Sequence, residues 1–282
     1  MGTLYLVATP IGNMEDITFR AVHTLRSAVL IAAEDTRQTQ KLLQRYEIST
    51  PAISYHEHNK LSRVNSILEA LARGDVALVS DAGTPGLNDP GYELVGAVLA
   101  AGFPVSAIPG AAAPVTALVI SGLPTDAFLY LGYLPRRPVE RRRRLEEAAG
   151  VPYTLIFLET PHRLLEALED IENILGPRRI AVARELTKLH EEVVRGTVRE
   201  AREHFLQNEP RGEFTLVIAG RSDEPEGPWT EERLEAALRA GVSNGMPQSQ
   251  LASQIAAEAG WQRRDVYRKI VELKERGDGN ES

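Results

Sequence analysis

Short apolar runs alternate with helical patterns along the first 122 residues of the chain. Segments of helical length, such as residues 16–28 and 61–74, repeat their apolar side chains every three or four positions. The apolar runs between them have the length of buried strands: LYLVAT (4–9), VLIAAE (29–34), PAISYH (51–56), VALVS (76–80) and PVSAIP (104–109). Strands and helices that alternate in this way predict βα units and an α/β fold whose first sheet is mostly parallel.

The residue composition changes between residues 123 and 140, where three prolines accompany an arginine-rich run. We interpret this segment as a linker. Strand and helix patterns then resume up to about residue 220 and predict a second α/β domain, and a turn-rich spacer at 223–228 precedes three helical patterns. The predicted domains are 1–124, 125–224 and 225–282, the last of them small, helical and similar to a helix-turn-helix.

Composition restricts the partners and the location that we expect. The formal net charge is −7, so no protein-wide positive field attracts a polyanion, and contacts with nucleic acid must come from local basic patches. The chain has no cysteine, which suits a reducing compartment. It also has no signal-peptide pattern at its start and no apolar stretch of about 18 residues. We expect a cytoplasmic protein that does not enter a membrane.

Four loops that follow predicted strands of the first domain are rich in Gly, Pro and short polar residues. They are TPIGN (9–13), EDTR (34–37), SDAGTPGLNDPG (80–91) and PGAAAP (109–114). In an open α/β sheet, ligands bind at this carboxyl edge of the strands. The dinucleotide and P-loop phosphate motifs are both missing from the sequence. Each loop alone is typical of a tight turn, but four of them at one edge favour a small-molecule cofactor approached by backbone groups.

Several of these blocks are collinear with a known family from residue 3 to about 220. The blocks ATPIGN (8–13), AAEDTR (32–37), LVSDAGTPGLNDPG (78–91), IPGAAAP (108–114), ETPHRL (159–164) and ARELTKLHEE (183–192) resemble the bacterial small-subunit ribosomal RNA methyltransferases of the tetrapyrrole-methylase superfamily. The resemblance implies two α/β domains with S-adenosylmethionine bound in the cleft between them, and a homodimer.

The implied reaction is methylation of the ribose 2'-hydroxyl of a cytidine in the decoding region of small-subunit ribosomal RNA, with the RNA or the 30S particle as partner. Two alternatives stay open at this stage. The chain could instead be a methyltransferase for a porphyrinoid small molecule, although the basic run and the C-terminal helices disfavour this. A non-catalytic ribosome-binding factor could keep the fold without the cofactor, although the intact Gly/Pro loops disfavour that as well.

The resemblance also assigns cofactor contacts. The loop that contains Gly83 would wrap the methionine part of the cofactor, with Thr84 where porphyrin-methylating relatives carry Asp, so that Asp81 or Asp89 could supply a carboxylate. The full set of implied cofactor contacts is Pro10, Ile11, Asp81, Gly83, Thr84, Pro85, Leu87, Ala112, Ala113, Leu158, Leu186 and Thr215.

A ribose hydroxyl must lose a proton during methyl transfer, which calls for a nearby base. Candidate bases are Glu34, Asp35, Glu159, Glu185, Lys188 and Glu191. We predict a catalytic neighbourhood of Asp35, Arg37, Lys188 and Glu159. An alternative function for Asp35, as the N-cap of the helix that follows it, remains equally open.

Two basic segments are candidates for RNA contacts. The run PRRPVERRRR (135–144) contributes Arg136, Arg137, Arg141 and Arg142, and Arg163 is a further candidate; the alternative is a solvated helix face paired with Glu146 and Glu147. The helix-turn-helix pattern contributes Arg263, Arg264, Arg268 and Lys269, with a structural cap or a dimer contact as the alternative. The motif YHEHNK (55–60) is a weak zinc pattern, and we expect no metal site.

Overall fold

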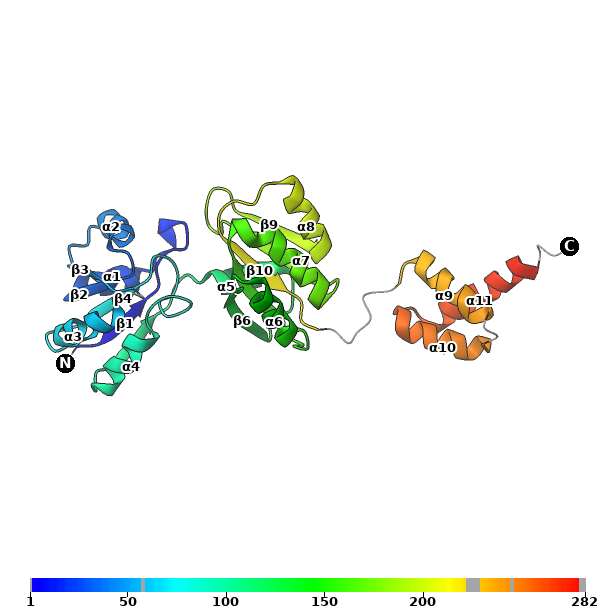
Figure 1. Ribbon diagram of the computed structural model, residues 1–282, viewed down its shortest axis with the longest axis horizontal. Coiled ribbons are helices and arrows are strands. Elements are labelled where there is room, and N and C mark those ends of the chain that lie inside the picture. Colours follow the sequence, from blue (N-terminus) through cyan, green and yellow to red (C-terminus); the bar gives the residue numbers. More distant parts are fainter. Residues whose placement is uncertain (1, 57–58, 222–228, 244–245, 279–282) are drawn as a thin grey trace. The chain divides into compact units, whose positions relative to one another are not determined.

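The first half of the chain forms a five-stranded parallel sheet. Its strands lie in the order β3-β2-β4-β1-β5 (Figure 1) and comprise β1 (Leu4–Val7), β2 (Leu30–Ala33), β3 (Ala52–Ser54), β4 (Val76–Val79) and β5 (Val105–Ile108). Both faces of the sheet are covered, as its short, continuous apolar strands require. The prediction of a mostly parallel first sheet is confirmed, and the carboxyl ends of all five strands lie at one edge.

Helices cover this sheet in two layers. One face packs against α1 (Phe19–Ser27) and α2 (Thr36–Arg45), and the other against α3 (Lys60–Leu71) and α4 (Tyr92–Ala100). Helix α1 begins three residues later than predicted because Thr18 is its N-cap, and the Thr18 hydroxyl oxygen accepts a hydrogen bond of 3.0 Å from the backbone N–H of Ala21. A short 3₁₀ turn over Met14–Asp16 precedes α1 and overlaps the predicted helix only at Asp16.

A second sheet follows and is mixed. Its strand order is β6-β7-β10-β8-β9, in which β6 (Phe128–Tyr133) and β7 (Thr154–Glu159) are parallel, whereas β8 (Arg179–Arg184), β9 (Glu192–Thr197) and β10 (Phe214–Ile218) pair antiparallel with their neighbours. One face packs against α6 (Pro138–Ala148), α7 (Leu164–Leu175) and α8 (Val198–Gln207), and the other against α5 (Ala113–Ser121). Helix α5, which the sequence placed with the first domain, therefore packs on the second sheet.

The segment 123–140 is not an irregular linker. It contains strand β6 and the first turn of α6, and its prolines lie at element ends, since Pro124 precedes β6 and Pro138 occupies the start of α6. Proline is favoured at the first helical position because its missing N–H needs no partner there. Strand β9 was also not predicted; it is a half-exposed edge strand without the continuous apolar run of its neighbours.

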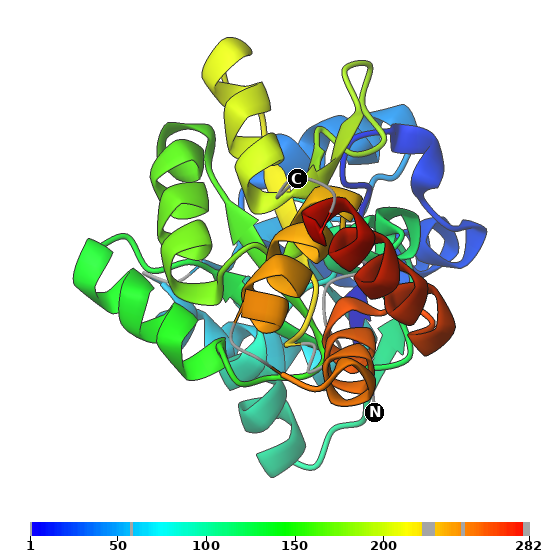
Figure 2. The same ribbon diagram turned by 90° about the vertical axis from the view of Figure 1, so that its right-hand side faces the viewer.

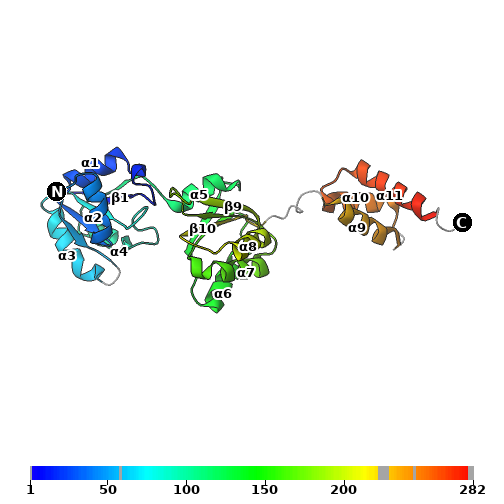
Figure 3. The same cartoon turned by 90° about the horizontal axis from the view of Figure 1, so that it is seen from above.

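The structure is a computed structural model that describes residues 2–56, 59–221, 229–243 and 246–278. Contacts divide the chain into two units, residues 1–221 and 222–282. The second unit confirms three predicted helices, α9 (Glu231–Ser243), α10 (Gln248–Ala259) and α11 (Arg263–Asp278) (Figures 2 and 3). They surround a core that includes Leu234, Leu251 and Ile270. The predicted spacer at 223–228 lies outside the described residues. Among the described helices, none is long and apolar enough to cross a membrane.

Candidate functional site

The loops after β1, β4 and β5 are held together by backbone bonds. The N–H of Thr9 donates to the carbonyl of Gly83 at 2.8 Å, and the N–H of Gly83 donates back to the carbonyl of Thr9 at 3.0 Å. The hydroxyl of Thr84 donates to the carbonyl of Ala111 at 3.2 Å. Gly83 has a φ of +80°, a conformation that favours glycine. Thr84 therefore stabilises the junction of two loops, which accounts for a hydroxyl residue in place of an aspartate.

These loops form one wall of a cavity of about 230 Å³, and the ends of β7 and β10 with the loop after β8 form the other wall. We call it the carboxylate pocket. Ten of the twelve predicted cofactor residues line it: Ile11, Asp81, Gly83, Thr84, Leu87, Ala112, Ala113, Leu158, Leu186 and Thr215. Pro10 lines a neighbouring cavity, and Pro85 is not among the lining residues of this pocket.

The carboxylate pocket takes its name from Glu34, Asp81, Asp89 and Glu213, which all line it. Glu34 and Asp81 lie close together, because the backbone N–H of Asp81 donates to Glu34 Oε2 at 3.2 Å. Burial raises the pKa of Glu34 and of Asp81, and burial together with the charge of Glu34 raises the pKa of Asp89 to about 6. The lining residues described for this pocket include no Lys, Arg or His. Such a pocket favours a cationic ligand.

Two tyrosines of β6 also line the carboxylate pocket. Tyr130 and Tyr133 lie on either side of a β-bulge at Gly132, whose φ is +67° and whose Cα lies against the side chain of Asn88. Burial raises the pKa of Tyr130 to about 12, so its phenol stays protonated. Asn88 and Phe214, which also line the pocket, were not predicted. The bulge has no signal in the sequence beyond a glycine inside a strand pattern.

A second cavity, of about 410 Å³, adjoins the first and lies beside helix α2; we call it the α2 pocket. It shares four lining residues with the carboxylate pocket: Ile11, Asp81, Ala82 and Glu213. Its remaining lining includes the side chains of Gln38, Lys41, Lys188, Met14 and Leu42, together with Pro10. The two cavities therefore meet along a common wall but differ in charge.

Asp35 is the N-cap of helix α2, as the alternative interpretation held. Its Oδ1 accepts from the backbone N–H of Arg37 at 2.8 Å, and its Oδ2 pairs with the Arg37 guanidinium at 2.7 Å. The hydrogen bonds from Arg37 lower the pKa of Asp35 to about 2. A carboxylate with so low a pKa is a weak base. The Arg37 side chain is 88% exposed and faces solvent at the edge of the site.

Lys188 lies in a loop that contacts the loop after β1. Its ammonium group is 2.9 Å from Glu185 Oε1 and 3.2 Å from Glu213 Oε2. Burial lowers the pKa of Lys188, but the bonds to Glu185 and Glu213 outweigh it and raise the pKa overall, so the side chain is a cation. Glu185 and Thr187 have φ values of 50° and 65°, an uncommon conformation that indicates strain at this loop.

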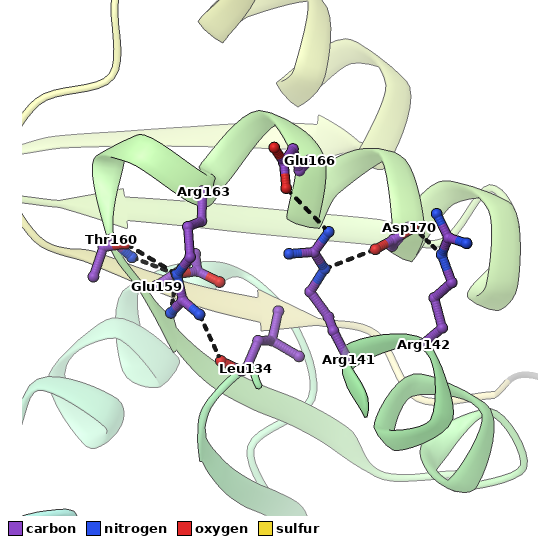
Figure 4. Close-up of polar contacts among 8 residues, drawn as sticks. All are labelled: Leu134, Arg141, Arg142, Glu159, Thr160, Arg163, Glu166 and Asp170. Atoms are coloured by element: carbon purple, nitrogen blue, oxygen red, sulfur yellow. Dashed lines mark hydrogen bonds and ion pairs between the residues drawn. The ribbon is translucent and has the colours of Figure 1, made fainter. Parts of the chain in front are cut away.

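Glu159 lies outside both cavities. Its side chain is fully buried, and Oε1 accepts from the Thr160 N–H at 2.6 Å and pairs with the Arg163 guanidinium at 2.5 Å (Figure 4). Arg163 also donates to the carbonyl of Leu134 at 3.0 Å. Burial raises the pKa of Glu159. This ion pair holds the end of β7 to the turn after β6, so the structure does not support Arg163 as an RNA contact: its guanidinium is already bonded inside the protein.

Arg141 is likewise not an RNA contact. Its side chain is 3% exposed and donates to Asp170 at 2.7 Å and to Glu166 at 3.3 Å, between helices α6 and α7 (Figure 4). Arg142 is 58% exposed although it also pairs with Asp170, at 2.8 Å. The helical period explains why Arg141 is buried and Arg142 is exposed, because one position in this run must face the neighbouring helix. Three predicted RNA contacts of the run, Arg136, Arg137 and Arg142, face solvent.

In the helical unit, Arg263 and Arg264 are exposed, and Arg268 is 68% exposed beside Asp265. Lys269 differs from these three. It is 20% exposed, pairs with Glu231 at 3.1 Å and lies 5.7 Å from the centre of the Trp261 ring, so it stabilises the unit itself. Among described residues, no cluster of three or more His, Asp or Glu side chains could hold a metal ion. Two residues of the weak zinc motif, at 57 and 58, lie outside the described part of the chain.

Comparison with known proteins places this fold in a class. Residues 3–202 match the sequence profile of the Tetrapyrrole (Corrin/Porphyrin) Methylases. Among solved structures, a cobalt precorrin-4 methyltransferase superposes with a TM-score of 0.61 at 17% identity, over 77% of this chain and 94% of that one. A uroporphyrin-III C-methyltransferase from Thermus thermophilus, complexed with S-adenosyl homocysteine, superposes with a TM-score of 0.54 at 22% identity, over 77% and 97%. The fold is that of a tetrapyrrole methylase.

Curated relatives define the family more closely. A ribosomal RNA small subunit methyltransferase I from Synechocystis is 49% identical over 98% of this chain and all of its own length, and one from Bacillus subtilis is 46% identical over 95% and 93%. The chain belongs to the ribosomal RNA small subunit methyltransferase I family. This membership confirms the predicted fold and enzyme class, a methyltransferase dependent on S-adenosylmethionine.

Proposed function

We propose that this chain transfers a methyl group from S-adenosylmethionine to the ribose 2'-hydroxyl of a cytidine in the decoding region of small-subunit ribosomal RNA. The observation that carries the proposal is the carboxylate pocket. S-adenosylmethionine bears a sulfonium and an ammonium charge, and the pocket offers Glu34, Asp81 and Asp89 without a basic residue among those described as its lining. Its bridged loops and the small side chains of Ala112 and Ala113 allow backbone groups to approach the ligand.

When bound, the cofactor supplies an electrophilic methyl group, which passes to the ribose oxygen while the sulfur keeps the bonding electron pair and the hydroxyl proton leaves to a base. Lys188, held as a cation by Glu185 and Glu213, can donate a hydrogen bond to the hydroxyl oxygen in the α2 pocket. Asp81 lies on the common wall, and its raised pKa makes it a stronger base than Asp35. We assign the proton to Asp81.

The remaining predicted catalytic residues act less directly in this proposal. Asp35 caps α2 and orients Arg37, whose exposed guanidinium can bind a phosphate. Glu159 fixes Arg163 and the turn after β6. Phosphates elsewhere on the RNA would contact the exposed arginines of both units, namely Arg136, Arg137, Arg142, Arg263, Arg264 and Arg268. Ribosomal RNA as substrate implies a cytoplasmic location.

We further propose that two copies of the chain associate. Exposed apolar side chains in the first unit offer surface for this, such as Val115 (47%) and Val119 (65%), which lie one turn apart on α5. Sedimentation equilibrium tests the state: the wild type is expected to be a dimer, and Val119→Glu a weaker one. A wild-type chain that sediments as a monomer at micromolar concentration excludes the dimer.

Two measurements test the proposed reaction. Calorimetry with S-adenosylmethionine should show binding by the wild-type chain and markedly weaker binding by Asp89→Ala. Deletion of the gene, followed by mapping of ribose methylation across small-subunit RNA, should remove one cytidine modification, and the wild-type gene should restore it. Binding without the loss of any ribose methyl would contradict the substrate, and a lack of binding would favour the non-catalytic factor.

A further inference from the structure

The two adjoining cavities differ in the charge of the ligand that they suit. The carboxylate pocket has four acidic lining residues and no basic one among those described, whereas the α2 pocket combines Lys41 and Lys188 with the two carboxylates of the common wall, Asp81 and Glu213. A ligand with a positive centre therefore favours the first cavity. A ligand that carries phosphate is better accommodated in the second, beside the ammonium groups.

We propose that the α2 pocket receives the acceptor nucleotide, extruded from the RNA, with Lys41 as a phosphate contact and Gln38 as the residue that contacts the base edge. The inference rests on the proposed function and deepens it. It assigns substrate binding to helix α2, which packs on the first sheet. The sequence had placed only Asp35 and Arg37, at the start of this helix, in the catalytic neighbourhood.

The lining of the α2 pocket matches the parts of a nucleotide. Pro10, Met14 and Leu42 give apolar surface against which a base can pack, and Lys41, Gln38 and Lys188 give polar groups. Enzymes that modify one nucleotide of a structured RNA need it outside the base stack, where side chains can reach its edges. A nucleotide held here with its ribose toward the four residues that line both cavities brings its hydroxyl to the place where the α2 pocket adjoins the carboxylate pocket.

The geometry of helix α2 orients the amide of Gln38. The ammonium of Lys41, one turn later on the same helix, donates to Gln38 Oε1 at 2.7 Å. This bond turns the amide oxygen toward Lys41 and leaves the amide NH₂ group as a donor. Cytosine presents an acceptor at N3 beside a donor at N4, and an amide can pair with both because its oxygen has a second lone pair. Uracil has a donor at N3 and does not fit this pair.

Four single variants on one helix test the inference. Gln38→Ala and Lys41→Ala remove the proposed contacts. Gln40→Ala and Arg45→Ala are matched controls, because both side chains are exposed on α2 and neither lines a cavity described above. Each full-length protein is assayed with small-subunit particles from a strain that lacks the gene, with labelled S-adenosylmethionine as methyl donor. Calorimetry gives the affinity for S-adenosylmethionine separately, and thermal unfolding checks that each variant folds.

We expect Lys41→Ala to raise the KM for the particle about tenfold or more, because a phosphate contact is lost. Gln38→Ala should lower kcat/KM by about 5-fold to 150-fold, the range for a bidentate base contact. Gln38→Ala should also reduce the preference for cytidine over uridine in particles reconstituted with either base at the target. Both variants should keep wild-type affinity for S-adenosylmethionine, and both controls should keep wild-type kinetics.

Two results overturn the inference in distinguishable ways. If Gln38→Ala and Lys41→Ala match their controls in KM, kcat and base preference while the wild type is active, the α2 pocket does not hold the nucleotide, and the proposed function stands. If the wild-type chain binds S-adenosylmethionine but methylates no particle, the proposed function itself fails, and this inference fails with it.

Discussion

The buried ion pair between helices α6 and α7 allows single substitutions to be ranked in advance by how much they lower the free energy of unfolding. Arg141 is 3% exposed and Asp170 is 5% exposed, and their atoms are 2.7 Å apart. Asp170→Ala leaves the Arg141 guanidinium buried with one remaining carboxylate, Glu166, at 3.3 Å. Removal of one partner of a buried pair costs about 3–5 kcal/mol, and we expect Asp170→Ala near the upper end of that range.

Substitution of the arginines should lower the free energy of unfolding by less, and the distances between the charged groups explain why. After Arg141→Ala, Asp170 keeps Arg142 at 2.8 Å, so the loss should be near 3 kcal/mol, the lower end of the same range. Arg142 is 58% exposed, and Arg143 is 73% exposed with its carboxylate partner 3.7 Å away. Substitution of either by Ala should change the free energy of unfolding little, because exposed ion pairs contribute little to stability. The expected order is Asp170, then Arg141, then the two exposed arginines.

Hydrogen exchange measured by mass spectrometry on peptides from α7 and β7 gives the local free energy of opening for each variant. Both tryptophans, Trp229 and Trp261, belong to the helical unit, so their fluorescence serves as an internal control that should not change. Equal losses below 1 kcal/mol for Arg141→Ala and Arg143→Ala would refute the reasoning, since a buried pair and a solvated arginine would then be energetically alike.

Three further predictions concern the site. Folding raises the pKa of Asp89 from an unfolded value near 4 to about 6, so the folded state binds this proton more tightly and stability falls as the pH rises from 4 to 6. Asp89→Asn should therefore have a higher Tm than the wild type at pH 7.5 and an equal Tm below pH 4. An equal Tm at both pH values would exclude the shift. In Gly12→Ala the new Cβ would lie 2.5 Å from Lys188 Cγ and 2.9 Å from the Leu186 carbonyl oxygen. We therefore expect urea unfolding to give a free energy of unfolding lower by about 1–3 kcal/mol, together with a lower kcat/KM. Unchanged values would show that the two loops separate freely. Lys188→Ala should lower kcat about 100-fold to 1000-fold with little effect on S-adenosylmethionine affinity by calorimetry, and unchanged turnover would remove Lys188 from the reaction.

Much of the fold could be predicted from the sequence because the local pattern of apolar residues agrees with the tertiary environment of each element. The strand VALV, for example, is apolar at every position, and all four side chains are buried in the centre of the first sheet. Strand β9 was not readable: it is an edge strand, half-exposed, and its pairing with β8 stabilises it more than its own composition does. Prolines misled the interpretation of 123–140, since proline marks the ends of ordered elements as readily as it marks linkers.

The family resemblance assigned twelve cofactor contacts, and ten of them line one pocket. For the contacts in the first domain the physical reason is that loops that follow parallel strands meet at one sheet edge. The sequence could not show that Arg141 is buried while Arg142 is exposed, that Lys188 lies between two carboxylates, or that Gln38 and Lys41 line a second cavity. These facts depend on which helix packs against which neighbour. The local hydrophobic pattern is a property of short segments, whereas strand order in the sheet, burial, charge pairing and cavity shape arise only when segments distant in the chain come into contact.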